Sequence, residues 1–97
     1  DPVQRRDLLS LFDLLEQAAR IAVRNLEEPG TCDLGEAERT DQALRQHGRS
    51  ARTGPEPQPD AGTRALRSSP VLSALLGTGE EVGGHLLNIS RVLAAAQ

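Results

Sequence analysis

Apolar residues recur at helical spacing along the first part of the chain. Between Asp1 and about Glu28, one group falls within an arc of about 100° when each residue advances by 100° around a helix axis: Leu8, Leu11, Phe12, Leu15, Ala19, Ala22 and Leu26. Further apolar residues widen this arc, and charged residues occupy the opposite side. The pattern predicts a long amphipathic helix that meets two neighbouring elements. It should end at Glu28-Pro29-Gly30, because the residue before a proline leaves the helical region and glycine tolerates the chain reversal.

A second helical region begins near Ser69. Ser69-Pro70 combines an N-cap side chain with a proline suited to the first helical position, and the apolar run that follows ends at Gly77. Thr78 to Glu81 match a capping box, which predicts a new helix start. The apolar side of this last helix spans an arc of about 120° and consists of Val82, His85, Leu86, Ile89, Val92, Leu93 and Ala96. Gly83 and Gly84 each cost roughly 1 kcal/mol relative to alanine, so they indicate either a close helix crossing or a later helix start.

The region between these helices carries a weaker pattern. Residues 33–47 favour a largely exposed helix whose only apolar contacts are Leu34, Ala37 and Leu44. From Gly48 to Thr63 there are three prolines, three glycines and no large apolar residue, a composition that cannot offset the entropy of ordering it. The sequence therefore predicts an N-terminal helical segment over 1–47, a flexible linker rich in proline, glycine and arginine over 48–68, and a C-terminal helical segment over 69–97.

Together these elements predict an all-α fold: a small helical bundle fragment with two strong amphipathic helices, one or two short helices and a disordered Pro/Gly-rich loop. No period-two alternation indicates a strand. The chain has 97 residues, a single aromatic residue, Phe12, and a single cysteine, Cys32, so an internal disulfide is excluded. Cores of this size supply little net stability without such a crosslink. Because the chain also begins at Asp1 and ends in a helical pattern, we expect a piece of a larger protein that needs further helices to cover its apolar sides.

Composition limits the kinds of molecule that this chain is expected to bind. The formal net charge is −3 and every basic residue is arginine, without the basic stripe of a nucleic-acid-binding protein. No apolar run reaches the roughly 18 residues of a membrane span. We therefore expect a protein partner, either flanking helices or another subunit, with no nucleic acid and no direct membrane insertion within this segment.

No arrangement of reactive side chains predicts an enzyme, a metal site or a cofactor. His85 falls within the apolar arc of the last helix, where we expect a core or boundary residue, and His47 lies at the end of the weak middle helix. Neither has a second ligand one helical turn away. Cys32, in a polar loop, is expected to be an exposed thiol without a positioned base. The adjacent pairs Glu27-Glu28 and Glu80-Glu81 point about 100° apart on a helix, so neither pair converges on a substrate.

Two short motifs carry alternative interpretations. Leu11 to Leu15 match an LxxLL pattern that resembles the nuclear-receptor box of transcriptional coactivators, whose leucines enter a receptor groove. The same spacing arises in any buried helix face, which is the interpretation we prefer. Asn88-Ile89-Ser90 is an acceptor sequence for N-glycosylation, and a chance match is the competing explanation. A glycan at Asn88 would favour an extracellular location; otherwise the sequence does not indicate a compartment.

The sequence thus predicts a non-enzymatic helical scaffold or protein-interaction segment of a larger protein. The alternative is an N-glycosylated helical subdomain of an extracellular or receptor ectodomain. The residues expected to form the core or partner face are Leu8, Leu11, Phe12, Leu15, Ala22, Leu26, Val82, Leu86, Ile89 and Leu93, and the expected glycosylation position is Asn88.

Overall fold

The computed structural model describes residues 2–53 and 70–96. In this part of the chain the elements are α1 (Pro2–Glu27), the short 3-10 turn η1 (Pro29–Thr31), α2 (Leu34–Thr53) and α4 (Pro70–Ala95), with no strand among the described residues. The predicted all-α helical bundle is confirmed. Of the helices described, none is both long and apolar enough to cross a membrane.

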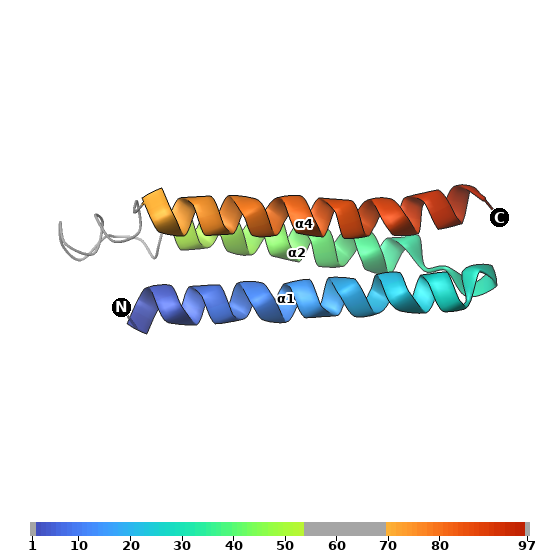
Figure 1. The fold of residues 1–97 in the computed structure, drawn as a ribbon, viewed down its shortest axis with the longest axis horizontal. Coiled ribbons are helices and arrows are strands. Elements are labelled where there is room, and N and C mark those ends of the chain that lie inside the picture. Colours follow the sequence, from blue (N-terminus) through green and yellow to red (C-terminus); the bar gives the residue numbers. More distant parts are fainter. Residues whose placement is uncertain (1, 54–69, 97) are drawn as a thin grey trace.

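The three helices lie side by side, with α1 and α4 parallel and α2 antiparallel to both (Figure 1). All three contribute to one group of buried side chains: Leu11, Leu44, Ala51, Leu72 and Leu76. A second group, nearer the α1–α2 connection, consists of Ile21, Ala37 and Leu87. The core is therefore a narrow seam along the bundle, in which each helix contributes only a few large residues.

The α1–α2 connection follows from its sequence. Helix α1 ends at Glu27 and the chain turns at Pro29–Thr31, as the Pro-Gly pair predicted. Asp33 then caps α2, since its Oδ1 accepts a hydrogen bond from the Glu36 amide at 3.0 Å. The Arg24 guanidinium bonds both oxygens of Glu36, at 3.3 and 2.9 Å. The hydrogen bond to the Glu36 carboxylate raises the pKa of Arg24 above its ordinary value.

Helix α2 is longer and more buried than the sequence indicated. It continues past His47 to Thr53, so the boundary expected at Gly48 was wrong; the remainder of the predicted linker lies outside the described residues. Its buried positions are Ala37, Asp41, Leu44, Gly48 and Ala51, alternately four and three residues apart. That spacing forms one continuous stripe on a helix. Because only Leu44 is large and apolar, hydrophobicity alone did not reveal the stripe.

Helix α4 is continuous where two helices were expected. Neither the stop at Gly77 nor the start at Thr78 occurs, and the Thr78 hydroxyl donates to the Ala74 carbonyl at 2.9 Å within the helix. A Cβ added at Gly79 would lie 2.8 Å from Leu11 Cδ2, and one at Gly83 would collide with Leu44 Cδ2. These two glycines therefore permit a close approach of α4 to both neighbouring helices. For Gly83 this is one of the two explanations that the sequence left open, whereas a Cβ at Gly84 would make only an ordinary contact, 3.5 Å from Arg45 Nη2.

The close approach at Gly79 predicts different effects on stability for two alanine substitutions. Gly77→Ala should stabilise the chain by about 1 kcal/mol through helix propensity, because the new methyl group would lie 3.8 Å from Arg52 Nη2. Gly79→Ala should be about 1–3 kcal/mol less stable than Gly77→Ala, since its methyl group overpacks the core at Leu11. Urea unfolding followed by circular dichroism measures both. Equal stabilisation by the two substitutions would contradict the close packing.

Candidate interaction surface

Helix α4 directs leucines, two glycines and a serine inward. Its buried positions are Leu72, Leu76, Gly79, Gly83, Leu87 and Ser90. The β-branched residues of the same helix lie on the other side, and Val92 is 68% exposed. The inward side of α4 is therefore displaced from the apolar arc expected from the sequence, and it combines three leucines with Gly79, Gly83 and Ser90.

Large apolar side chains remain uncovered on both α1 and α4. On α1 these are Leu9, Phe12, Val23 and Leu26, and on α4 they are Val71, Leu75, Val82, Ile89 and Val92. Each is at least 43% exposed, and Phe12 is 59% exposed. We refer to these residues as the α1–α4 face. Rows of large apolar residues exposed to solvent are unusual on a solitary domain, so this face is the candidate surface for an interaction.

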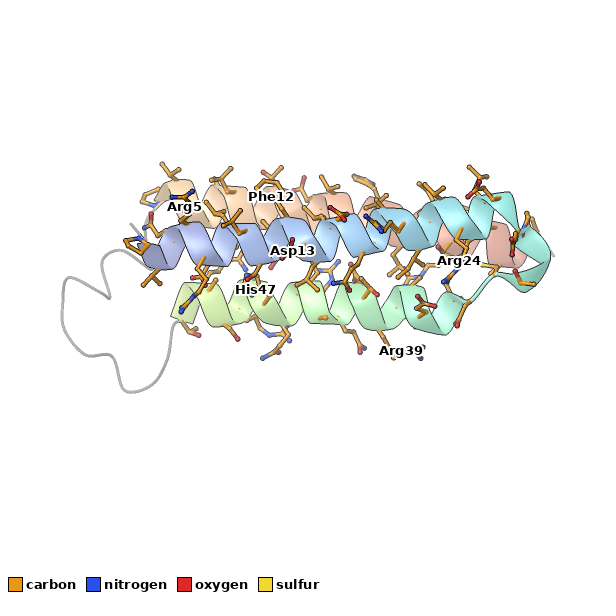
Figure 2. The ribbon with its side chains drawn as sticks, turned by 90° about the horizontal axis from the view of Figure 1, so that it is seen from below. Arg5, Phe12, Asp13, Arg24, Arg39 and His47 are labelled. Carbon is orange, nitrogen blue, oxygen red and sulfur yellow. The ribbon has the colours of Figure 1, made fainter. Side chains whose placement is uncertain are left out.

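Contacts within the bundle place both rows on one side. On α4, Gly79 and Ser90 contact Leu11 and Asn25 of α1, whereas Glu80 and Gly83 contact α2. Around the α4 axis, the exposed apolar residues follow the positions that contact α1 and lie away from the positions that contact α2. On α1, Arg24 bonds α2 through Glu36, and the apolar row lies on the other flank of the helix. Figure 2 shows Phe12 on the α4 side of α1 and His47 on the α2 side. The two rows therefore flank the α1–α4 contact and form one face opposite α2.

The α1–α4 face follows a heptad repeat. On α4, residues 71, 75, 78, 82, 85, 89 and 92 alternate in steps of four and three, and on α1 residues 5, 9, 12, 16, 19, 23 and 26 do the same. The nine exposed apolar residues occupy nine of these fourteen positions, and the other five are Arg5, Glu16, Ala19, Thr78 and His85. This spacing is the one used by helices that pack against another helix along their whole length. The face thus has the pattern of a helix-packing surface.

The structure divides the predicted face residues into three groups. Leu11 and Ala22 are buried; Leu8, Leu15, Leu86 and Leu93 are half-buried; Phe12, Leu26, Val82 and Ile89 are exposed. Leu8, Leu14 and Leu15 pack against the core group that contains Leu11. The leucines of the LxxLL pattern are therefore used inside the bundle, in agreement with the core interpretation of that motif.

The reactive residues lie apart from one another. His85 is exposed beside Ile89 and Val92 in a shallow groove, so the expectation that it would be a core or boundary residue was wrong. His47 is half-buried, and its Nε2 lies 2.8 Å from the Asp7 carbonyl oxygen, which positions α2 against α1. Cys32 is half-buried rather than exposed, with its Sγ 3.6 Å from the Ser90 carbonyl oxygen. Within the described residues, no group of histidine, cysteine or acidic side chains could hold a metal ion.

A buried polar pair joins α1 to α4 and was not found from the sequence. Asn25 and Ser90 are each 1% exposed, and Asn25 Nδ2 donates to Ser90 Oγ at 3.0 Å. Asn25 Oδ1 also accepts a hydrogen bond from the Asp33 amide at 3.2 Å. A buried pair of this kind fixes the axial position of one helix against the other, since any shift would leave its polar atoms unbonded. In the sequence, these two core positions carry polar residues. Polar residues in a predicted helix are normally assigned to its exposed side, so the pair was missed.

The glycosylation motif lies partly within this pair. Asn88 is exposed, but Ser90, whose hydroxyl completes the acceptor sequence, is buried against Asn25. Modification of Asn88 would therefore have to precede the packing of α4. The structure gives Ser90 a packing role that is independent of any glycan.

Asp41 is a second buried polar residue, at the contact between α2 and α4. Its Oδ2 accepts a hydrogen bond from Arg45 Nε at 2.8 Å, and this bond raises the pKa of Arg45 above its ordinary value. Among the described residues, Asp41 Oδ1 has no hydrogen-bond partner. A buried carboxylate with an unpaired oxygen costs stability, and a Cβ added at Gly83 would lie 3.4 Å from this oxygen.

Comparisons of this chain with protein-family profiles, with curated proteins and with solved structures found no match. The account of its function therefore depends on its own residues.

The buried pair predicts a stability difference between two asparagines. Asn25→Ala should lower the free energy of unfolding by about 1–3 kcal/mol, because it leaves Ser90 Oγ and the Asp33 amide without their partner. Asn88→Ala, on the exposed side of α4, should change it by no more than about 0.5 kcal/mol. Chemical denaturation of the two variants measures the difference, and equal stabilities would refute the role given to Asn25.

Proposed function

We propose that this chain is a non-enzymatic helical interaction module whose α1–α4 face packs against the apolar side of another α-helical surface. The observation that supports the proposal is the pair of exposed apolar rows, both in heptad spacing and both on the side opposite α2. The uncovered residues are leucine, valine, isoleucine and phenylalanine, the types that contribute most to helix packing.

The energetics favour coverage of this face. Fully burying a valine, leucine, isoleucine or phenylalanine side chain contributes about 1.5–3 kcal/mol. Nine such residues stand at least 43% exposed. Association costs an estimated 4–15 kcal/mol in lost freedom of motion, so covering most of the face can exceed this cost. An α-helical partner suits the face better than an extended strand, because only a helix repeats its side chains in steps of three and four residues.

The proposal is tested with a synthetic amphipathic helix that carries leucine and isoleucine at its a and d heptad positions. We expect the 97-residue chain to bind this peptide and the double variant Phe12→Gln with Ile89→Gln to bind it about tenfold more weakly or worse. Because both residues are exposed, the stability of the variant should change by no more than about 1 kcal/mol in total. Isothermal titration calorimetry measures the affinities.

The matched control is Ala43→Gln, which introduces the same side chain on the exposed side of α2. It should leave peptide binding unchanged. Equal affinities of the wild type and the double variant, or equal losses from the double variant and the control, would exclude the α1–α4 face as the binding surface.

The second candidate function is an N-glycosylated subdomain of an extracellular protein, favoured by the exposure of Asn88. It predicts that chain secreted from eukaryotic cells carries extra mass that an Asn-glycanase removes. Asn88→Gln should abolish the extra mass with little effect on stability. Ser90→Ala is unsuitable for this purpose because it also breaks the buried bond to Asn25. Unmodified mass in the secreted wild-type chain would exclude this function.

A further inference from the structure

We propose that the α1–α4 face is covered by the same face of a second copy of this chain, packed antiparallel about a twofold axis. This inference depends on the proposed function, and it names the partner. A twofold interface requires a surface that complements itself, and the charges and the heptad positions of the face meet that requirement.

The charges along the outer edge of α1 are self-complementary. Arg6, Asp13, Arg20 and Glu27 follow one another every seven residues, are all exposed, and border the row of Leu9 and Val23. Their signs alternate. When a second α1 lies antiparallel, Arg6 faces Glu27 of the second copy and Asp13 faces Arg20 of the second copy, so that all four residues meet an opposite charge. A shift by one heptad in either direction would place Arg6 against Arg20 or Asp13 against Glu27, which are repulsive pairs.

The apolar residues of α1 form layers in the same register. Leu9 then packs against Leu26 of the second copy, and Phe12 packs against Val23 of the second copy. At the centre, Glu16 faces the small residue Ala19. The Glu16 carboxylate is 2.7 Å from Arg20 Nη2 of its own chain, so its charge is paired within that chain. A single polar residue at such a core position specifies register at some cost in stability.

Helix α4 agrees with the same axis. Leu11 contacts Gly79, and Asn25 bonds Ser90. These two pairs define which residues of α1 and α4 lie at the same height along the bundle axis. The midpoint of the α1 layers, between residues 17 and 18, is therefore level with about residue 84 of α4. An axis there pairs Leu75 with Val92 of the second copy, and Val82 with His85 of the second copy. On the outer edge of α4, Glu81 faces the neutral Asn88, so no row of like charges opposes the pairing.

The face is large enough for a stable dimer. Residues 71–92 extend about 32 Å at 1.5 Å per residue, and two helices side by side are about 20 Å wide. The projected flat area is on the order of 600 Å² per chain, without the additional surface of protruding side chains. It is close to the roughly 800 Å² per partner of a standard interface.

A charge-exchange experiment tests the register. The 97-residue chain should sediment as a dimer, and Arg20→Asp and Asp13→Arg should each weaken the dimer about tenfold or more, because each variant opposes like charges across the axis. An equal mixture of the two variants should form a heterodimer again, since one chain then carries aspartate at both exchanged positions and faces arginine at both positions of the other chain. This restoration would also demonstrate that both variants fold. Arg39→Asp, on the outer edge of α2 (Figure 2), changes the charge equally and should leave the dimer intact.

The outcomes separate this inference from the proposed function. The antiparallel self-pairing would be overturned if Arg20→Asp and Asp13→Arg dimerised as strongly as the wild type. It would also be overturned if the equal mixture of the two variants stayed monomeric. A wild-type chain that stays monomeric but binds the synthetic amphipathic helix would overturn the second copy as partner and preserve the interaction module. A monomer that binds no such helix would overturn both.

Discussion

The structure depends on how closely α4 approaches its two neighbours. At Gly79 and Gly83 the absence of a side chain lets Leu11 of α1 and Leu44 of α2 pack directly against the α4 backbone. Because these glycines lie on the inward side together with Leu72, Leu76 and Leu87, the β-branched residues of α4 lie on the outward side. Close packing at the seam and apolar exposure at the surface are thus two consequences of the same helix rotation.

The buried pair Asn25–Ser90 constrains the position of α4 along α1, whereas the glycines constrain the rotation of α4 about its own axis. The glycines determine which side of α4 faces inward, and the hydrogen bond determines how far along α1 it lies. Together they align two heptad rows that are distant in sequence into one surface. The proposed interaction function and the proposed self-pairing both depend on that alignment, since a rotated or shifted α4 would separate the rows.

The sequence predicted the elements better than their orientation. Helix α1 and its end at Glu27 followed from a strong apolar period and a Pro-Gly pair. The length of α2 did not, because its buried stripe contains Asp41, Gly48 and Ala51, which carry no hydrophobic signal. For α4, the apolar arc assigned Val82 and Ile89 to a core or partner face without distinguishing the two, whereas the packed side consists of Leu72, Leu76 and Leu87 with two glycines and a serine. Hydrophobicity measures how strongly a residue avoids water, and it does not measure how closely two backbones approach, so the candidate surface emerged only from the packing.

The rotation of α4 can be measured directly by nuclear Overhauser effects in the wild-type chain, whatever its oligomeric state. Strong cross-peaks are expected from the Leu11 methyl groups to the Gly79 α-protons and from the Leu44 methyl groups to the Gly83 α-protons. Cross-peaks from Leu11 and Leu44 to the methyl groups of Val82 and Ile89 of the same chain, in place of those to the glycines, would mean that α4 buries its branched side, and they would contradict the account.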